Sequence, residues 1–215
     1  MRSYGQWCAL ARALDVVGER WSLLIVRELL DGPKRYTDLL DGVCGISTDV
    51  LAARLRDLED DGIVSRRELP RPAASKVYEL TEKGAGLGPV VASLARWGMQ
   101  LLGERGPDDE FRPHWLASGL RALLRTDETA GVSLVVDYVL DHDEHVRIRV
   151  DDGQLRVDPE PHGEPDLVVH ASLGTLADLG DGSLRASDAV ADGRLRFDGS
   201  RDAVRTYARL FSPHR

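Results

Sequence analysis

The sequence contains few cysteines and no long apolar run, and both absences narrow the class of protein. Its two cysteines, Cys8 and Cys44, are too few for a disulfide framework, which favours a reducing cytoplasm. No apolar run approaches the roughly eighteen residues that cross a bilayer, and residues 1–8 lack the apolar core of a secretory signal. We therefore expect a cytoplasmic protein with no membrane partner and no need of disulfide or metal staples.

An excess of positive charge is also absent. The net charge is −8 over 215 residues, which taken as a total argues against a nucleic-acid partner, because DNA is a polyanion. The charge is unevenly distributed, however. Residues 1–105 carry 15 basic and 15 acidic residues, whereas residues 106–215 carry 13 basic and 21 acidic ones. The acidic excess therefore belongs to the second half, and the first half can still present a basic surface.

Motifs that carry catalysis or bind cofactors are missing too. Gly84, Gly86 and Gly88 do not have the spacing of a dinucleotide-binding loop, and no βαβ unit surrounds them. No nucleophile elbow or Ser/His/Asp grouping has supporting context. His142 and His145 have metal-ligand spacing, but they lie between two predicted strands, where an acidic turn is the ordinary outcome. We expect no enzyme activity, no cofactor and no metal.

A linker divides the chain into two predicted domains. Residues 103–110 combine two glycines, one proline and four acidic residues, a composition typical of linkers. We expect domains at 1–105 and 113–215, joined by residues 106–112. Helical periodicity dominates the first domain, and Val/Leu-rich segments separated by turn residues dominate the second, so the expected fold class is α+β.

The first domain has the element order of a winged helix-turn-helix. Helices are predicted at 21–30, 36–43, 47–61 and 81–102, and strands at 63–69 and 76–80. On the helix at 47–61, Leu51, Leu55 and Leu58 recur at i, i+4 and i+7, which builds one buried stripe. A short helix, a tight turn at Gly45, a second helix with a small exposed face and a two-stranded ribbon make up the unit.

The residues expected to contact DNA gather on this unit. Arginine guanidiniums suit phosphate and guanine, and the N–H groups at a helix N-terminus favour phosphate. Alone, Arg54 and Arg56 would be interpreted as solvated helix charges, but this context favours DNA. Asp49 would repel phosphate, so it either accepts from a cytosine amino group or shapes the site by exclusion. The candidate DNA-binding residues are Lys34, Arg35, Ser47, Thr48, Asp49, Ala52, Ala53, Arg54, Arg56, Arg66, Arg67, Arg71 and Lys76.

The first domain resembles the HxlR-type winged-helix transcriptional regulators over about residues 4–102. The resemblance is carried, in unbroken order, by CALARALDVVGERW at 8–21, GPKRY at 32–36, GIS at 45–47, LAARLRDLE at 51–59, DGIV at 61–64 and YELTEKG at 78–84. It implies a homodimeric DNA-binding regulator without a cofactor. The helix at 47–61 would enter the major groove of one half-site, and the helices near 9–17 and 84–102 would form the dimer contact.

The same resemblance makes Cys8 a candidate redox sensor. It matches a cysteine that some members of the family use as a thiol sensor, whereas the alternative is a small buried side chain, the commoner state of a free cysteine. Sensing requires a lowered thiol pKa and access to solvent. Cys44 lies beside the tight turn, where packing is its expected role.

In the second domain the pattern predicts a sheet with helices. Strands are predicted at 133–140, 145–150, 155–158, 166–171 and 195–198, and helices at 113–125, 172–180, 184–191 and after Ser200. The first three strands are successive and antiparallel, and Asp152 and Gly153 form the tight hairpin turn between the last two. This order predicts a mostly antiparallel sheet with helices packed against it.

The second domain resembles the sterol carrier protein type 2 family over roughly residues 113–212. The carriers are PDLVV at 165–169, residues 173–179, AVADGRLRFDG at 189–199 and the last helix. The resemblance implies a curved sheet covered by helices, with an apolar tunnel for lipid-like molecules. Candidate tunnel residues, for which ordinary core packing is the alternative, are Trp115, Leu120, Tyr138, Leu176, Leu179, Phe197, Tyr207 and Phe211.

Together these patterns predict a transcriptional regulator with two functional parts. A dimeric winged-helix half would bind a double-stranded operator, and the second half would bind a small apolar effector that prefers one DNA-binding state. Two alternatives remain open. The second domain could serve only structure or dimerisation, or the protein could be a lipid-like ligand carrier that uses the winged half for partner contact.

Overall fold

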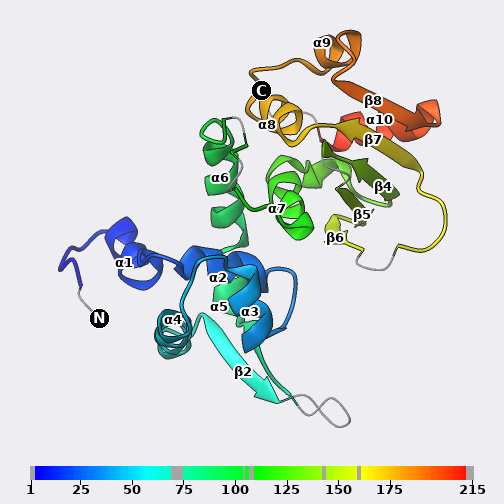
Figure 1. Ribbon diagram of the computed structural model, residues 1–215. Helices are drawn as coiled ribbons and strands as arrows, with labels where there is room; N and C mark the ends of the chain where they lie inside the picture. The colour runs from blue at the N-terminus through cyan, green and yellow to red at the C-terminus, as the bar shows by residue number, and fades with distance from the viewer. Residues whose placement is uncertain are drawn as a thin grey trace. The chain divides into compact units, whose positions relative to one another are not determined.

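The chain folds into two compact units. The computed structural model describes residues 3–68, 75–103, 105–106, 109–141, 144–158 and 161–211. The units comprise Met1–Val91 and Ala92–Arg215 (Figure 1). Each contains helices and its own sheet, which confirms the α+β class. The helix at Gly88–Met99 spans the division between the units, so this division is not a linker. The predicted domain boundaries at 105 and 113 stay predictions.

The first unit has the element order of the predicted winged helix. Its elements are α1 Ala9–Val17, α2 Ser22–Leu29, β1 Lys34–Arg35, α3 Tyr36–Gly42, α4 Thr48–Asp60, β2 Val64–Glu68, β3 Lys76–Leu80, α5 Glu82–Ala85 and α6 Gly88–Met99. The sheet is antiparallel with the order β1-β3-β2. Strand β1, which was not predicted, has two residues, and so short a segment shows no periodicity. Figure 1 shows β2 extending away from the helices of this unit.

The turn from α3 into α4 follows from two residues. Gly45 has φ +80°, a left-handed conformation that glycine adopts without steric cost. Ser47 then caps α4, because its hydroxyl accepts a hydrogen bond from the Val50 N–H at 3.4 Å. The predicted stripe of Leu51, Leu55 and Leu58 is buried against α2 and α3. Helix α4 is therefore fixed by its apolar side and leaves its other side outward.

The single helix predicted at 81–102 is wrong, since the structure contains two helices there. Thr81 caps the first, α5, by accepting from the Gly84 N–H at 3.1 Å. A Cβ at Gly84 would lie 2.0 Å from the Ile63 carbonyl oxygen. Gly84 therefore permits a close approach of two backbones, and the glycine-rich segment that follows breaks the helix before Gly88 begins α6.

The second unit is a five-stranded sheet with helices. Its elements are α7 Pro113–Leu123, the 3₁₀ turn η1 Thr126–Glu128, β4 Ser133–Val139, β5 His145–Asp151, β6 Gln154–Val157, β7 Leu167–Ala171, α8 Leu173–Asp181, α9 Ala186–Ala191, β8 Leu195–Gly199 and α10 Arg201–Leu210. The strand order is β6-β5-β4-β7-β8. Only the β4–β7 pair is parallel among these strands, so the predicted mostly antiparallel sheet is confirmed.

Strands β5 and β6 are joined by the predicted hairpin turn. Asp152 has φ +47° and Gly153 has φ +87°. Positive φ at both central residues is the mark of a type I′ turn, whose twist matches that of the flanking strands. The turn sets the register in which Val150 pairs with Leu155, so both apolar side chains point to the same face.

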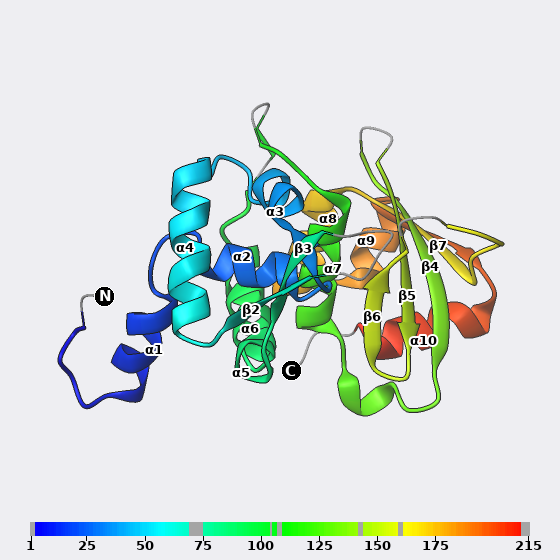
Figure 2. The same cartoon turned by 90° about the horizontal axis from the view of Figure 1, so that it is seen from below.

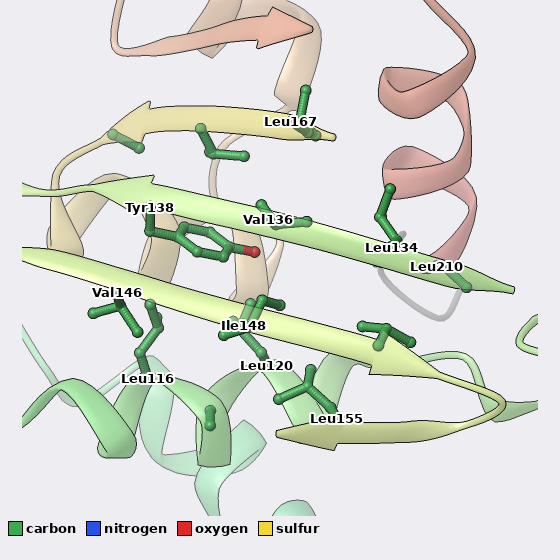
Figure 3. Packing of buried hydrophobic residues seen from close by; sticks show 14 of the residues in the cluster. Leu116, Leu120, Leu134, Val136, Tyr138, Val146, Ile148, Leu155, Leu167 and Leu210 are labelled. Carbon is green, nitrogen blue, oxygen red and sulfur yellow. The ribbon is translucent and has the colours of Figure 1, made fainter. Parts of the chain in front are cut away.

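One face of the sheet carries the core of the second unit. Leu134, Val136 and Tyr138 alternate along β4 and are buried, as expected for a half-buried strand. Figure 3 shows Leu116 and Leu120 of α7 lying next to this face. Figure 2 shows β6, β5, β4 and β7 in the order that their pairing requires.

The opposite face of the sheet holds an ion pair between a buried arginine and a partly exposed carboxylate. Arg147 of β5 donates from Nε and Nη2 to the Asp137 carboxylate of β4, the latter bond at 2.7 Å. Its Nη1 donates to the carbonyl oxygens of His162 and Gly163 at 3.0 and 2.9 Å. The hydrogen bonds that the Arg147 guanidinium donates to Asp137 raise its pKa. One side chain thus fastens residues 162–163 to the sheet.

Candidate nucleic-acid interface

The outward side of α4 is the centre of the candidate interface. Ser47, Thr48 and Asp49 are exposed, and Ala52 and Ala53 are partly exposed. The Tyr36 hydroxyl donates to the Thr48 carbonyl oxygen at 2.6 Å, so α3 holds the first turn of α4. The small side chains and the free N–H groups at this helix end leave room for a phosphate or a base edge.

The two predicted arginines of α4 differ in their surroundings. Arg54 forms an ion pair with Asp57 at 2.8 Å and lies 3.8 Å from the Glu19 carboxylate, and its side chain is 22% exposed. Arg56 is exposed and makes no ion pair within the described ranges. Arg56 is therefore available to an incoming phosphate as it stands, whereas Arg54 must exchange partners first.

Lys34 and Arg35 lie where β1 leads into α3. The Lys34 ammonium is 3.7 Å from the Glu28 carboxylate, a fully buried group that also accepts from Arg27 at 2.9 Å. The Arg35 side chain is exposed, and its backbone N–H donates to Asp38 at 3.0 Å. Lys34 thus neutralises a buried acid, while Arg35 projects into solvent.

The cations of the ribbon are also accompanied by acids. Arg67 makes a bidentate contact with Glu79, with N···O distances of 3.0 and 3.1 Å, and these hydrogen bonds raise the pKa of Arg67. Arg66 lies 3.9 Å from Glu59. Lys76 is exposed at the start of β3.

Two features of the ribbon concern the cations that the sequence predicts to contact DNA. Arg71 lies outside the described residues. The acids that accompany Arg66 and Arg67 are Glu59 of α4 and Glu79 of β3. Only the strand register would have indicated the Arg67–Glu79 pair, in which the two residues are diagonal neighbours.

Exposed apolar side chains occupy α1, the segment before it, and α6. Trp7 is fully exposed and Leu10 is 67% exposed. On α6, Val90, Leu94 and Trp97 recur at helical spacing and are each about half exposed. Large apolar side chains gathered on one helix face are unusual on a monomer surface and indicate an interaction site.

The predicted tunnel residues take two kinds of position in the second unit. Leu120 and Tyr138 are buried in its core, and Leu176, Leu179, Phe197, Tyr207 and Phe211 are partly buried against that core. Trp115 packs edge-on against His114 with ring centroids 6.0 Å apart. The Tyr138 hydroxyl donates to the Tyr207 hydroxyl at 3.0 Å.

An aromatic cluster surrounds that hydroxyl pair. The Tyr207 ring lies 5.6 Å from Phe197 and 5.0 Å from Phe211, measured between centroids. Burial raises the pKa of Tyr207 to about 12, and it raises that of Tyr138 as well. Both phenols are therefore neutral over the physiological range, and they form the polar centre of an otherwise apolar cluster.

Known proteins match both parts of the chain. Residues 16–105 match the HxlR-like helix-turn-helix family. The HTH-type transcriptional regulator YodB of Bacillus subtilis is 40% identical over 88 residues, which make up 41% of this chain and 79% of that protein. The uncharacterized HTH-type transcriptional regulator sll1512 of Synechocystis is 36% identical over 98 residues, or 46% of this chain and 73% of that protein.

This chain belongs to the HxlR-like helix-turn-helix family. Residues 120–212 match the SCP-2 sterol transfer family, so both predicted resemblances are confirmed. A solved structure of the reduced form of the transcriptional regulator YodB from B. subtilis is 35% identical, and the match covers 47% of this chain and all of that chain, with a TM-score of 0.40.

Other features of this HxlR-like chain bear on sensing and on membranes. Cys8 is exposed and immediately precedes α1, whereas Cys44 is partly buried and its Sγ lies 3.6 Å from the Asp41 carbonyl oxygen. A sensing role for Cys8 stays a prediction. Within the part of the chain that the structure describes, no helix is long and apolar enough to span a bilayer.

The predicted turn around His142 lies only partly within the described ranges. His142 itself is outside them, and His145 is exposed at the start of β5. Among the residues described, no three His, Cys, Asp or Glu side chains gather as a metal site requires.

The buried phenol of Tyr207 predicts a specific loss of stability at high pH. An unfolded tyrosine has a pKa of about 10, so the raised value favours the folded state fully below about pH 10. That contribution is lost as the pH rises through about 12. Subtracting the absorbance titration of the Tyr207→Phe variant from that of the wild-type protein isolates the signal of Tyr207. We expect this difference to show one phenolate forming near pH 12 in the native protein and near pH 10 in denaturant. A native difference centred near pH 10 would contradict the burial.

Proposed function

We propose that this protein is a transcriptional regulator that binds an operator in double-stranded DNA. The outward face of α4 carries the proposal. Three leucines hold the helix in the core from one side, and Asp49 and Arg56 project from the other. Its family relatives bear the name of HTH-type transcriptional regulators.

The proposed binding mode places the first turns of α4 in the major groove. Phosphate would meet the helix N-terminus at Ser47 and Thr48, and Arg56 would contact phosphate or a guanine edge. Arg35 and Lys76 would contact the flanking backbone. The acidic second half would be repelled by the duplex, so DNA contact would be left to the first unit.

Replacing both α4 arginines tests this binding mode. We expect Arg54→Gln with Arg56→Gln to weaken operator binding roughly 30-fold or more, because each guanidinium contact contributes about 1–3 kcal/mol. The operator is identified by genome-wide mapping of bound DNA and the affinity is measured by fluorescence anisotropy. Arg149→Gln, which removes an exposed arginine of the second unit, is the matched control. Sequence-specific binding retained by the double variant would refute the proposal.

We further propose that the regulator is a homodimer formed through the exposed apolar faces of α1 and α6. A second copy would cover Leu10 and Trp97 and place two α4 helices on a two-fold symmetric operator. Exposed Trp and Leu side chains at helical spacing suit such an interface, because buried aromatic anchors carry much of the energy of association.

A charge in this face should dissociate the dimer. We expect Trp97→Glu to raise the dimer dissociation constant roughly 30-fold or more, since a carboxylate would be desolvated without a partner. Val190→Glu changes an apolar residue on α9 that is also about half exposed and should leave the dimer intact. Sedimentation velocity over a dilution series measures both. A Trp97→Glu protein that stays dimeric at wild-type concentrations would exclude this face.

The second unit is proposed to bind a small apolar effector. Its match to the SCP-2 sterol transfer family supports this role, as do the partly buried Phe197 and Phe211, which pack on Tyr207 of the Tyr138–Tyr207 pair. The effector regulates only if its affinity differs between the DNA-competent and DNA-incompetent states. The same difference would make DNA change the effector's affinity by an equal factor.

Ligand removal tests the effector role. We expect native mass spectrometry of the freshly purified protein to show an added apolar molecule, and extraction with an apolar adsorbent to shift the operator dissociation constant about 5-fold or more. Adding the extracted molecule back should reverse the shift. An empty second unit whose DNA affinity does not respond to extraction would favour a purely structural domain.

A further inference from the structure

The α4 arginine that lies deepest in the candidate interface is held by a residue from a distant part of the chain. Arg54 contacts two carboxylates, with Nη2 2.8 Å from Asp57 and Nη1 3.8 Å from Glu19. Asp57 lies one turn along α4 and moves with Arg54. Glu19 comes from the turn between α1 and α2, so its contact links that turn to α4.

The turn that carries Glu19 is packed next to the segment that leads into α4. Trp21 has φ +81°, a left-handed conformation that is uncommon for a bulky side chain. Its ring packs on the apolar core, with Arg20 stacked over it at 4.6 Å. A Cβ at Gly45 would lie in ordinary contact with the same ring, at 3.7 Å. The packing of Trp21 therefore fixes the α1–α2 turn next to the N-terminus of α4.

The two carboxylates hold Arg54 with different strength. Asp57 forms a close ion pair at 2.8 Å, whereas the Glu19 contact is long and the Glu19 side chain is 66% exposed. A phosphate approaching α4 competes with Glu19 for the same guanidinium edge. Because an exposed ion pair is weak, DNA can displace Glu19. Breaking this ion pair lowers the affinity for every duplex, whatever its sequence.

We propose that Glu19 is a positioning residue that competes with DNA for Arg54 and sets the affinity threshold of the protein. In the free protein Glu19 holds the Arg54 fork against the α1–α2 turn. On binding, DNA contacts the Nη1 edge and Glu19 returns to solvent, while Asp57 keeps its ion pair with Nη2. This inference rests on the proposed DNA-binding function and adds to it that Glu19 lowers the affinity for DNA.

A double-mutant cycle on the full-length protein tests the competition. The probe is a duplex that the wild-type protein selects from a random-sequence pool, with affinity measured by fluorescence anisotropy. We expect Glu19→Gln to tighten binding about two- to five-fold, the range that an exposed ion pair allows. In an Arg54→Gln background the same change should have no effect, because the group for which Glu19 competes is gone. Glu19→Asp, which keeps the carboxylate, should bind DNA with an affinity between those of the wild-type protein and Glu19→Gln.

The control separates competition from a general loss of negative charge. Asp60→Asn removes an exposed acid of α4 that forms no ion pair within the described ranges, so any change that it causes should be equal in both backgrounds. Thermal unfolding should show the same midpoint for every variant, which a structural role for Glu19 would change.

The outcomes distinguish this inference from the function on which it rests. If Arg54→Gln weakens binding but Glu19→Gln tightens it equally in both backgrounds, or leaves it unchanged in the wild-type background, the competition is refuted and the DNA-binding role of Arg54 stands. If Arg54→Gln does not weaken binding, the proposed role of Arg54 fails and the competition fails with it. An effect of Glu19→Gln that disappears with Arg54 supports the inference.

Discussion

The first unit depends on the apolar stripe along α4. Leu51, Leu55 and Leu58 are almost completely buried, and their burial decides which side of the helix faces outward. Burying three leucines stabilises the fold by several kcal/mol, at about 1.5–3 kcal/mol for each side chain. The Ser47 hydroxyl, which accepts from the Val50 N–H, and the Tyr36 hydroxyl, which donates to the Thr48 carbonyl oxygen, then fix where the helix begins. The exposed face is thus set by packing on the opposite side.

Local patterns made much of this arrangement predictable from the sequence. The spacing of Leu51, Leu55 and Leu58 predicted the buried stripe of α4, and Asp152 with Gly153 predicted the hairpin turn. Each signal is carried by residues within a few positions of one another, so tertiary contacts are not needed to interpret it.

Other features depend on contacts between residues that are distant in the sequence. The close approach of Gly84 in α5 to the Ile63 carbonyl oxygen joins segments that are far apart in the sequence, and the pattern predicted one helix where α5 and α6 are separate. The pairs Arg54–Glu19 and Arg67–Glu79 join separate elements, so the sequence marked the arginines as candidates but could not show that acids accompany them.

The parallel pairing of β4 with β7 has a consequence for how the chain folds during synthesis. Central strand β4 obtains its second neighbour only after β5 and β6 have been made, since Asp137 pairs with Val168, and Leu210 of α10 completes the core. The contacts of the first unit are complete by Val91. On the ribosome the winged helix can therefore fold first, whereas the sheet waits for nearly the whole chain and is the slower, more aggregation-exposed part.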